Sequence, residues 1–178
     1  MSRQDQPPAL PDASCGAQRR LVEMQGFVGL TDEDLSRVEP WLRFAPAICA
    51  AWAAVATGVG SVAGLLVLAA IAMLGTLLPH HPFDAFYNHG VRRVLGARPI
   101  PRYGAPRRFA CGVASVWLTA TAATFAAGAT IAATLLGAAF TVVALVPVVT
   151  GFCVPSFLFQ QGRRLVRRLA ARVPTATG

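Results

Sequence analysis

The sequence contains no lysine and is poor in charged residues of every kind. All 16 basic side chains are arginine, and charged residues make up 13% of the 178 positions, whereas 54% are hydrophobic. A water-soluble domain carries roughly 25% charged residues. Two long stretches, residues 45–78 and 109–154, have no charged residue at all. These absences exclude an ordinary water-soluble surface and indicate an integral membrane protein.

Two further absences limit the class of membrane protein. The uncharged stretches also lack histidine, and because intramembrane ionisable residues usually mark ion and proton pathways, a pump or an ion-coupled transporter is disfavoured. Residues 1–20 lack the basic start and apolar core of a secretory signal peptide. This segment is polar and rich in proline, and we expect it to form a loose tail.

Length and turn residues divide the uncharged stretches into four predicted spans. A single helix over residues 45–78 would be about 51 Å long, whereas the hydrocarbon core is about 30 Å thick and needs about 20 residues. Glycine and serine at 57–61 and the sequence AAGA at 126–129 favour turns. We therefore expect an all-α membrane protein with four transmembrane helices in two antiparallel hairpins, plus short interfacial helices on the N-terminal side and at the C-terminus. The predicted spans are residues 45–59, 61–78, 109–127 and 130–152.

The distribution of arginine predicts the orientation. Residues 1–44 carry a net charge of −2, whereas residues 80–108 and 156–178 each carry +5. Short arginine-rich loops stay on the cytoplasmic side of a membrane, which requires an even number of spans before each basic segment. The expected organisation is a cytoplasmic segment 1–44, a membrane domain 45–155 with a cytoplasmic loop at 80–108, and a basic tail at 156–178.

Composition also suggests the setting. The abundance of alanine, glycine and arginine is typical of a bacterial source, so the sequence predicts a multi-pass protein of the bacterial inner membrane with both termini in the cytoplasm. The basic segments flank apolar stretches, and we therefore expect the bilayer and its anionic headgroups as partners rather than nucleic acid.

Two segments outside the spans have helical patterns. Near the C-terminus one helical face is apolar and the other is basic, which predicts an amphipathic helix on the inner leaflet or, alternatively, a solvated basic tail. The residues expected to contact lipid headgroups are Arg163, Arg164, Arg167, Arg168 and Arg172, opposite Leu165, Val166, Leu169 and Val173. Before the first span, Thr31 and Asp34 have a capping-box spacing that predicts a short surface helix.

The cysteines offer the clearest candidate chemistry. Antiparallel spans would place Cys49, Cys111 and Cys153 at a similar depth near the cytoplasmic face. Such thiols can serve packing, since cysteine is a small apolar residue. Alternatively, Cys111 and Cys153 form a redox pair if their Cα atoms come within about 7 Å, with nearby arginines favouring the thiolate. A permanent structural disulfide is not expected on a reducing cytoplasmic side.

A metal site is the third interpretation. His81, Asp84 and His89 lie in the loop at the same face as the thiols. The chain has no C-x-x-C or H-x₃-H spacing to support such a site. Asp84 is the loop's one acid among six arginines, so an ion pair or a cap on a short helix at 83–94 is the alternative role.

Several motifs resemble a known family. They are HPFDAFYNHGVRR (81–93), RRFACGVASVWL (107–118), FCVPS (152–156) and, before them, PWLRFAPAIC (40–49). Together they resemble DUF4395, a bacterial membrane family of unknown function. The resemblance implies a small multi-span protein and a link to thioredoxin-like or sulfurtransferase proteins. An acidic residue often precedes the last cysteine motif in this family, where the present chain has Gly151.

These observations predict a membrane-embedded thiol protein that handles electrons or sulfur through Cys111 and Cys153. The partner would be a thioredoxin-like or sulfurtransferase protein, and no cofactor is expected. The alternative is a non-catalytic scaffold or accessory subunit of a larger membrane complex. Whether the protein is an enzyme stays open, with a non-enzymatic role favoured. Passive passage of a small neutral solute along the bundle's threonines is a further, less favoured function.

Overall fold

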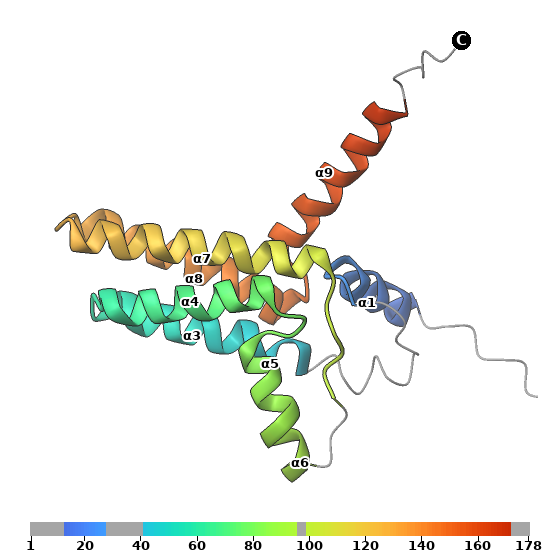
Figure 1. Ribbon diagram of the computed structural model, residues 1–178, viewed down its shortest axis with the longest axis horizontal. Helices are drawn as coiled ribbons and strands as arrows, with labels where there is room; N and C mark the ends of the chain where they lie inside the picture. Colours follow the sequence, from blue (N-terminus) through green and yellow to red (C-terminus); the bar gives the residue numbers. More distant parts are fainter. Residues whose placement is uncertain (1–12, 28–40, 96–98, 172–178) are drawn as a thin grey trace, which may run out of the picture.

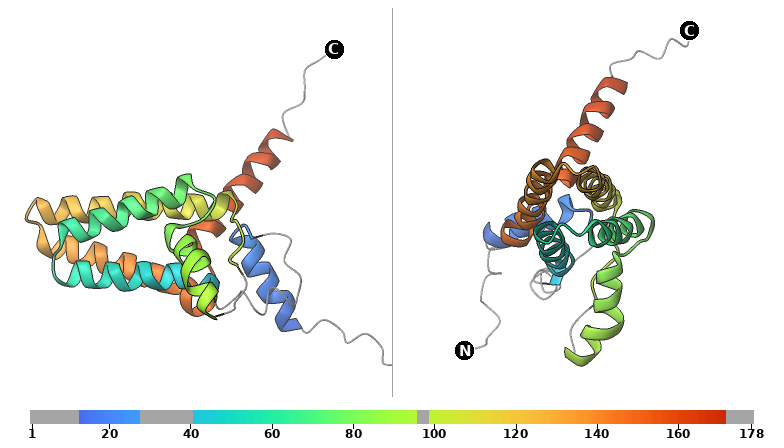
Figure 2. Two further views of the ribbon diagram at one scale, coloured as in Figure 1. Left: turned by 60° about the horizontal axis from the view of Figure 1, so that its bottom comes forward. Right: turned by 90° about the vertical axis from the view of Figure 1, so that its left-hand side faces the viewer.

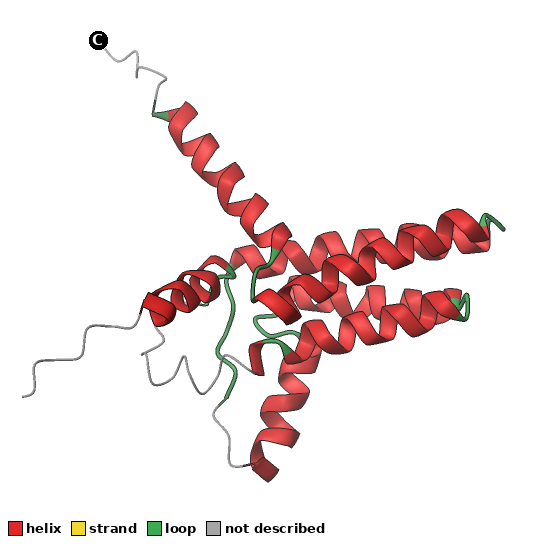
Figure 3. Cartoon of the chain, turned by 180° about the vertical axis from the view of Figure 1, so that it is seen from behind, coloured by secondary structure: helices red, strands yellow, loops and turns green. Residues whose placement is uncertain are grey.

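Four helices lie side by side and form an antiparallel bundle (Figure 1). The computed structural model describes residues 13–27, 41–95 and 99–171, and over these residues all regular structure is helical (Figure 3). The bundle consists of α3 (Phe44–Gly58), α4 (Val62–Leu77), α7 (Ala105–Ala126) and α8 (Thr130–Thr150). Helices α3 and α7 each pack against both α4 and α8, so the contacts form a closed ring.

Short glycine-containing turns close each hairpin at the end of the bundle remote from the loop. Gly60 (φ 64°) and Gly128 (φ 79°) adopt the left-handed conformation that glycine tolerates best. Ser61 then caps α4, because its hydroxyl accepts a hydrogen bond from the Gly64 amide at 3.1 Å. Both turns lie where the sequence predicts them.

Helix length separates the two hairpins. Helices α7 and α8, of 22 and 21 residues, are long and apolar enough to cross a membrane. Helix α4 reaches that length only together with the helical segment that follows it, at a bend of 79°, and α3 has 15 residues. At 1.5 Å per residue α3 is about 22 Å long, less than the hydrocarbon core. Length and composition alone therefore establish two spanning helices, or three with the bent pair, rather than the four that the sequence predicts.

The bundle has small residues inside and large apolar residues outside. Its buried cluster contains Ala53, Ala56, Ala69 and Ala122 around Leu65, Leu68, Leu118 and Phe140. Outward-facing side chains such as Val59, Ile131 and Val149 are 73–80% exposed. Close packing of small residues is typical of helices that associate in lipid, where burying leucine against leucine gains little.

Threonines within the bundle make local hydrogen bonds. Thr119, Thr121 and Thr141 each donate to the carbonyl four residues earlier, at 2.8–2.9 Å. The hydroxyl protons of these three threonines are thus used within their own helices.

The remaining helices gather at the other end of the bundle (Figure 2). The loop between the hairpins contains, in order, α5 (Pro82–Phe86), the π-helical turn η1 (Tyr87–Val91) and α6 (Arg92–Leu95), and the chain then returns to α7. Helix α9 (Val154–Ala170) follows α8, packs its start against α7 and then leaves the bundle. The helix predicted around Thr31 and Asp34 lies outside the described residues, as do Arg172 and Val173.

Helix α1 (Ala13–Met24) corrects one expectation. The sequence predicts a loose tail through residue 20, yet the segment ASCGAQRRLVEM is helical because it contains mostly strong helix formers. Beyond its end Gln25 donates to the Gly151 carbonyl at 2.7 Å, and Gln160 donates to the Met24 carbonyl at 2.8 Å. These two bonds join the end of α1 to the loop before α9 and to α9 itself.

Candidate functional site

A mainly apolar cavity of about 140 Å³ lies among the bundle helices near the loop end. Its wall includes Cys49 from α3, Cys111 from α7 and Cys153 at the start of α9. His81 and Arg107 provide its charged or ionisable edge, and alanine, valine, proline and aromatic side chains provide most of the rest. The three thiols, from segments far apart in the sequence, therefore face one space.

Cys49, Cys111 and Cys153 are free and partly buried. The antiparallel hairpins thus place Cys111 and Cys153 on the wall of one cavity, and their approach to disulfide distance stays a prediction. Whether the two exchange electrons remains a prediction.

Gly75 leaves room beside α4 for the side chains of His81 and Cys111. A Cβ atom at Gly75 would lie 2.7 Å from His81 Cδ2 and 3.2 Å from Cys111 Sγ. The Tyr103 hydroxyl donates to the Gly75 carbonyl at 2.7 Å. The absence of a side chain at Gly75 therefore leaves room for the imidazole and the thiol beside the α4 segment that Tyr103 binds.

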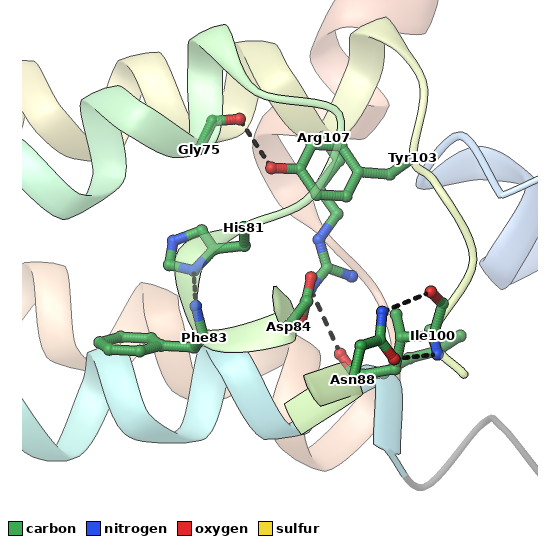
Figure 4. Close-up of polar contacts among 9 residues, drawn as sticks. Gly75, His81, Phe83, Asp84, Asn88, Ile100, Tyr103 and Arg107 are labelled. Carbon is green, nitrogen blue, oxygen red and sulfur yellow. Dashed lines mark hydrogen bonds and ion pairs between the residues drawn. The ribbon is translucent and has the colours of Figure 1, made fainter. Parts of the chain in front are cut away.

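The His81 ring is held in one orientation (Figure 4). Its Nδ1 accepts a hydrogen bond from the Phe83 amide at 3.3 Å, which caps α5. Burial, with the nearby charge of Arg107, lowers the pKa of His81 to about 3. The ring is therefore neutral at pH 7, and since Nδ1 is the acceptor, Nε2 carries the proton.

Arg107 and Asp84 form a buried ion pair beside the cavity. Arg107 Nη2 lies 3.6 Å from Asp84 Oδ2, and their side chains are 7% and 0% exposed. The guanidinium also lies over the rings of Phe27 and Tyr103, at 5.0 and 5.4 Å. Burial raises the pKa of Asp84, and the charge of Arg107 opposes that shift. This geometry agrees with the ion-pair role expected for Asp84.

The ion pair leaves hydrogen-bonding capacity unused. Both Asp84 carboxylate oxygens and Arg107 Nη1 are buried without a hydrogen-bond partner. A buried donor without an acceptor costs about 1–3 kcal/mol, and more when it is charged. A bound ligand that offers an acceptor to Arg107 Nη1 would remove this cost.

The residues proposed for a metal site do not converge. Asp84 pairs with Arg107, whereas the exposed His89 bonds through Nδ1 to the Ala85 carbonyl at 2.8 Å. Within the described ranges no group of three or more His, Cys, Asp or Glu side chains is placed to hold a metal ion. The metal hypothesis for His81, Asp84 and His89 thus gains no geometric support.

Residues missed by the sequence analysis complete the site. Gly75 and Tyr103 come from α4 and from the chain returning towards α7, and no local pattern links either to a thiol. Ser156 is fully buried, and its hydroxyl lies 3.2 Å from both Cys153 Sγ and the Pro106 carbonyl. A signal existed for Ser156, since it follows Cys153 by three residues at a helix start.

Asn88 positions the returning chain. Its side-chain oxygen accepts from the Ile100 amide at 2.7 Å, and its side-chain nitrogen donates to the Ile100 carbonyl at 3.0 Å. This pair of bonds joins η1 to the segment that leads to Tyr103 and Arg107 (Figure 4). The loop is thus folded against itself at the end of the bundle where the cavity lies.

Fold and site together define a class: an all-helical protein with apolar helices of membrane-spanning length and a thiol-lined cavity under a folded loop. Residues 39–164 match the family described as Domain of unknown function (DUF4395), and the chain belongs to that family. This match confirms the resemblance seen in the motifs. No curated protein and no solved structure matches the chain.

Proposed function

We propose that the protein crosses a bacterial inner membrane four times, with both termini in the cytoplasm. Two observations support this arrangement. The bundle exposes large apolar side chains, and its four helices carry no charged residue except in the first turn of α7. Arginines bind helix ends at the loop end of the bundle. Arg43 donates to the Val148 carbonyl at 3.0 Å, and Arg108 donates to the Leu77 carbonyl at 2.9 Å. Both pairs are typical of a membrane–water interface, where arginine satisfies terminal carbonyls.

We propose further that Cys111 and Cys153 exchange a dithiol for a disulfide with a thioredoxin-like partner protein. The observation that carries this proposal is the convergence of thiols from three separate segments on one cavity. One thiolate attacks the partner's disulfide and forms a mixed disulfide, and the second thiolate displaces the partner. The two thiols of this protein lose two electrons and two protons, and the partner's disulfide gains them as two thiols.

Two neighbouring groups would assist the reaction. The guanidinium of Arg107 supplies positive charge at the cavity edge, and Ser156 offers a hydroxyl to Cys153 Sγ at 3.2 Å. A positive charge and a hydrogen-bond donor both favour a thiolate. The same nucleophile would suit transfer of sulfur, so a sulfurtransferase partner remains part of the proposal.

The test counts thiols in the full-length protein in its membrane. The protein is equilibrated with oxidised and then reduced thioredoxin-type protein, and free thiols are counted by maleimide mass tagging. We expect loss and recovery of two thiols in the wild type and in Cys49→Ser, the matched control. We expect no loss of a pair in Cys111→Ser or Cys153→Ser. Persistence of the pair in Cys153→Ser would show that Cys153 is not the second thiol.

One observation favours the scaffold alternative. Residues 161–171 are exposed along their whole length, so most of α9 has no partner within the described chain. A protein that docks against this helix would account for the exposure. Affinity purification from the native membrane separates the two functions, since a stable complex that survives both cysteine substitutions favours the scaffold.

A further inference from the structure

The cavity has the size and lining of a site for an apolar ring. Its volume is about 140 Å³, and an engineered apolar cavity of about 150 Å³ binds benzene. Trp117 and Phe140 pack edge to face on its wall, with ring centroids 6.0 Å apart, and the small side chains of Ala114 and Ala144 also line the space. A six-membered ring with small substituents fits such a space, whereas a peptide or a nucleotide does not.

Two nitrogen hydrogen-bond donors lie at the cavity edge, so a ring bound in the cavity should carry a hydrogen-bond acceptor. Arg107 lines the cavity, its side chain is 7% exposed, and its Nη1 has no hydrogen-bond partner. His81 also lines the cavity, and its Nε2 carries the ring proton because Nδ1 accepts from Phe83. An uncharged ligand with carbonyl oxygens would satisfy these donors without bringing a further charge into an apolar space.

The helices around the cavity provide access from the bilayer. Val113, Val143 and Ala144 belong to α7 and α8, which are long enough to span a membrane, and each is only partly buried. Pro147 lies beside them in α8 and removes one hydrogen bond from the helix ladder. A lipid-soluble ligand would therefore reach the cavity between these two helices.

We propose that the cavity binds the ring of a membrane quinone, which oxidises the Cys111–Cys153 dithiol. The two thiols form one S–S bond and give up two electrons and two protons, and the quinone takes up both to become a quinol. Arg107 and the Nε2 proton of His81 hold the ring oxygens, where negative charge develops during the transfer. This inference rests on the proposed thiol function and names the small-molecule oxidant of the same site.

Binding is tested without oxidation in the full-length Cys111→Ser/Cys153→Ser protein in nanodiscs. The probe is a benzoquinone with a decyl chain and no free ring position, so that it cannot alkylate thiols. We expect saturable quenching of Trp117 fluorescence, identified by its loss in Trp117→Phe. Ala144→Leu, which fills the cavity, should raise the apparent Kd at least tenfold. Ala139→Leu, an exposed position on the same helix, is the control and should leave the Kd unchanged.

A second probe tests the role of the donors. The matched dimethoxybenzene has the same ring and chain but no carbonyl oxygen, and we expect it to bind at least tenfold more weakly. Equal binding of the two probes, or quenching that is unsaturable and equal in Ala144→Leu and Ala139→Leu, would overturn the quinone site. In either case the cavity would be a nonspecific apolar space.

Redox stoichiometry separates this inference from the proposed function. With the reduced wild-type protein, we expect one quinone consumed for every two thiols lost. If oxidised thioredoxin-type protein forms the disulfide but the quinone does not, the quinone assignment is wrong and the thiol function stands. If the quinone binds saturably but no oxidant joins Cys111 to Cys153, the thiol function is wrong and so is the oxidant role.

Discussion

Gly75 controls how closely His81 and Cys111 approach each other across α4. The ring of His81 is held in place, because Nδ1 caps α5 and the imidazole packs at a tilt of 43° against Phe83 with ring centroids 5.2 Å apart. A side chain at position 75 would therefore act on the thiol environment without altering any ionisable group. The contact tests whether the site depends on its packing.

We predict that Gly75→Ala destabilises the protein by about 1–3 kcal/mol, the usual cost of overpacking. The added Cβ would lie 2.7 Å from His81 Cδ2, a distance that forces a shift. The unfolding free energy in mixed detergent micelles measures the effect. Gly112→Ala is the control, because its Cβ would meet Thr76 at an ordinary 3.5 Å. Equal stability of the two variants would contradict the close packing around Gly75.

We predict that the lowered pKa of His81 makes the stability of the protein depend on pH. Its folded pKa of about 3 lies below the ordinary value of 6.5, so protonation favours the unfolded chain. The stabilising contribution is complete above pH 6.5 and falls by about 1.4 kcal/mol per pH unit as the pH decreases towards 3. We expect His81→Asn to lose this slope, since asparagine still caps α5 but does not titrate.

Two comparisons isolate the contribution of His81. Asp84 has the opposite sign, because its raised pKa favours folding as the pH falls, but it is present in both proteins and largely cancels in their difference. His89→Asn, at an exposed position, should keep the wild-type slope. Parallel stability curves for the wild type and His81→Asn between pH 6.5 and 4 would show that His81 is solvated.

The sequence identifies the site residues that lie at the ends of apolar stretches. It does not identify those whose place in the site depends on contacts between distant parts of the chain. Cys111 and Cys153 both lie at ends of apolar stretches, and antiparallel connection alone brings them together. Tyr103 donates to the Gly75 carbonyl from a returning chain that Asn88 holds at Ile100. No spacing in the sequence encodes that contact.

Helix α9 combines an apolar and a basic face outside the bundle. Leu165 and Leu169 are 59% and 54% exposed, and arginines occupy the opposite side. An exposed apolar face on a basic helix is typical of a segment that lies in the membrane interface. Anionic lipid would attract it by about 1 kcal/mol for each arginine near the surface.

We predict that the two faces of α9 differ in their contact with lipid. In nanodiscs with brominated acyl chains, Leu169→Trp should add fluorescence that is strongly quenched, whereas Arg167→Trp on the opposite face should add fluorescence that is not. Replacing Arg163 and Arg164 by glutamine should reduce the quenching of Leu169→Trp in anionic membranes but not in neutral ones. Equal quenching at positions 167 and 169 would instead support a solvated tail.

At the level of elements, turn chemistry is the part of the fold that the sequence predicts best. Gly60 and Gly128 mark the two hairpin turns, because few residues other than glycine adopt the left-handed backbone conformation found there. Helix α1 escapes prediction because contacts at its end, such as the bond from Gln160 to the Met24 carbonyl, join residues 136 positions apart. Ala13, Ala17, Leu21 and Met24 do have helical spacing, but the polar composition of residues 1–20 outweighs it in the sequence analysis.

In the molecule as a whole, the short first hairpin suggests two crossings of the membrane, whereas its exposed apolar side chains suggest four. Helix α3 is shorter than an average span, yet Val55 and Val59 on its surface are 67% and 73% exposed. Burying such a side chain is worth about 1.5–3 kcal/mol. Helix α4 presents Leu66 and Val67 in the same way, at 45% and 48%. A bilayer that thins locally around the first hairpin would resolve the conflict at a modest cost for each ångström of mismatch.

We therefore predict four crossings, which can be distinguished from two by labelling single cysteines in an otherwise cysteine-free full-length chain. A membrane-impermeant maleimide should reach Val59→Cys and Ala129→Cys from the periplasm. It should reach Arg93→Cys and Arg168→Cys only after the inner membrane is opened, because arginine-rich segments stay on the cytoplasmic side. If only α7 and α8 cross, Val59→Cys will be protected together with Arg93→Cys. If Arg93→Cys and Arg168→Cys react from opposite sides, the number of crossings between them is odd. In that case the cavity thiols would not share one membrane face.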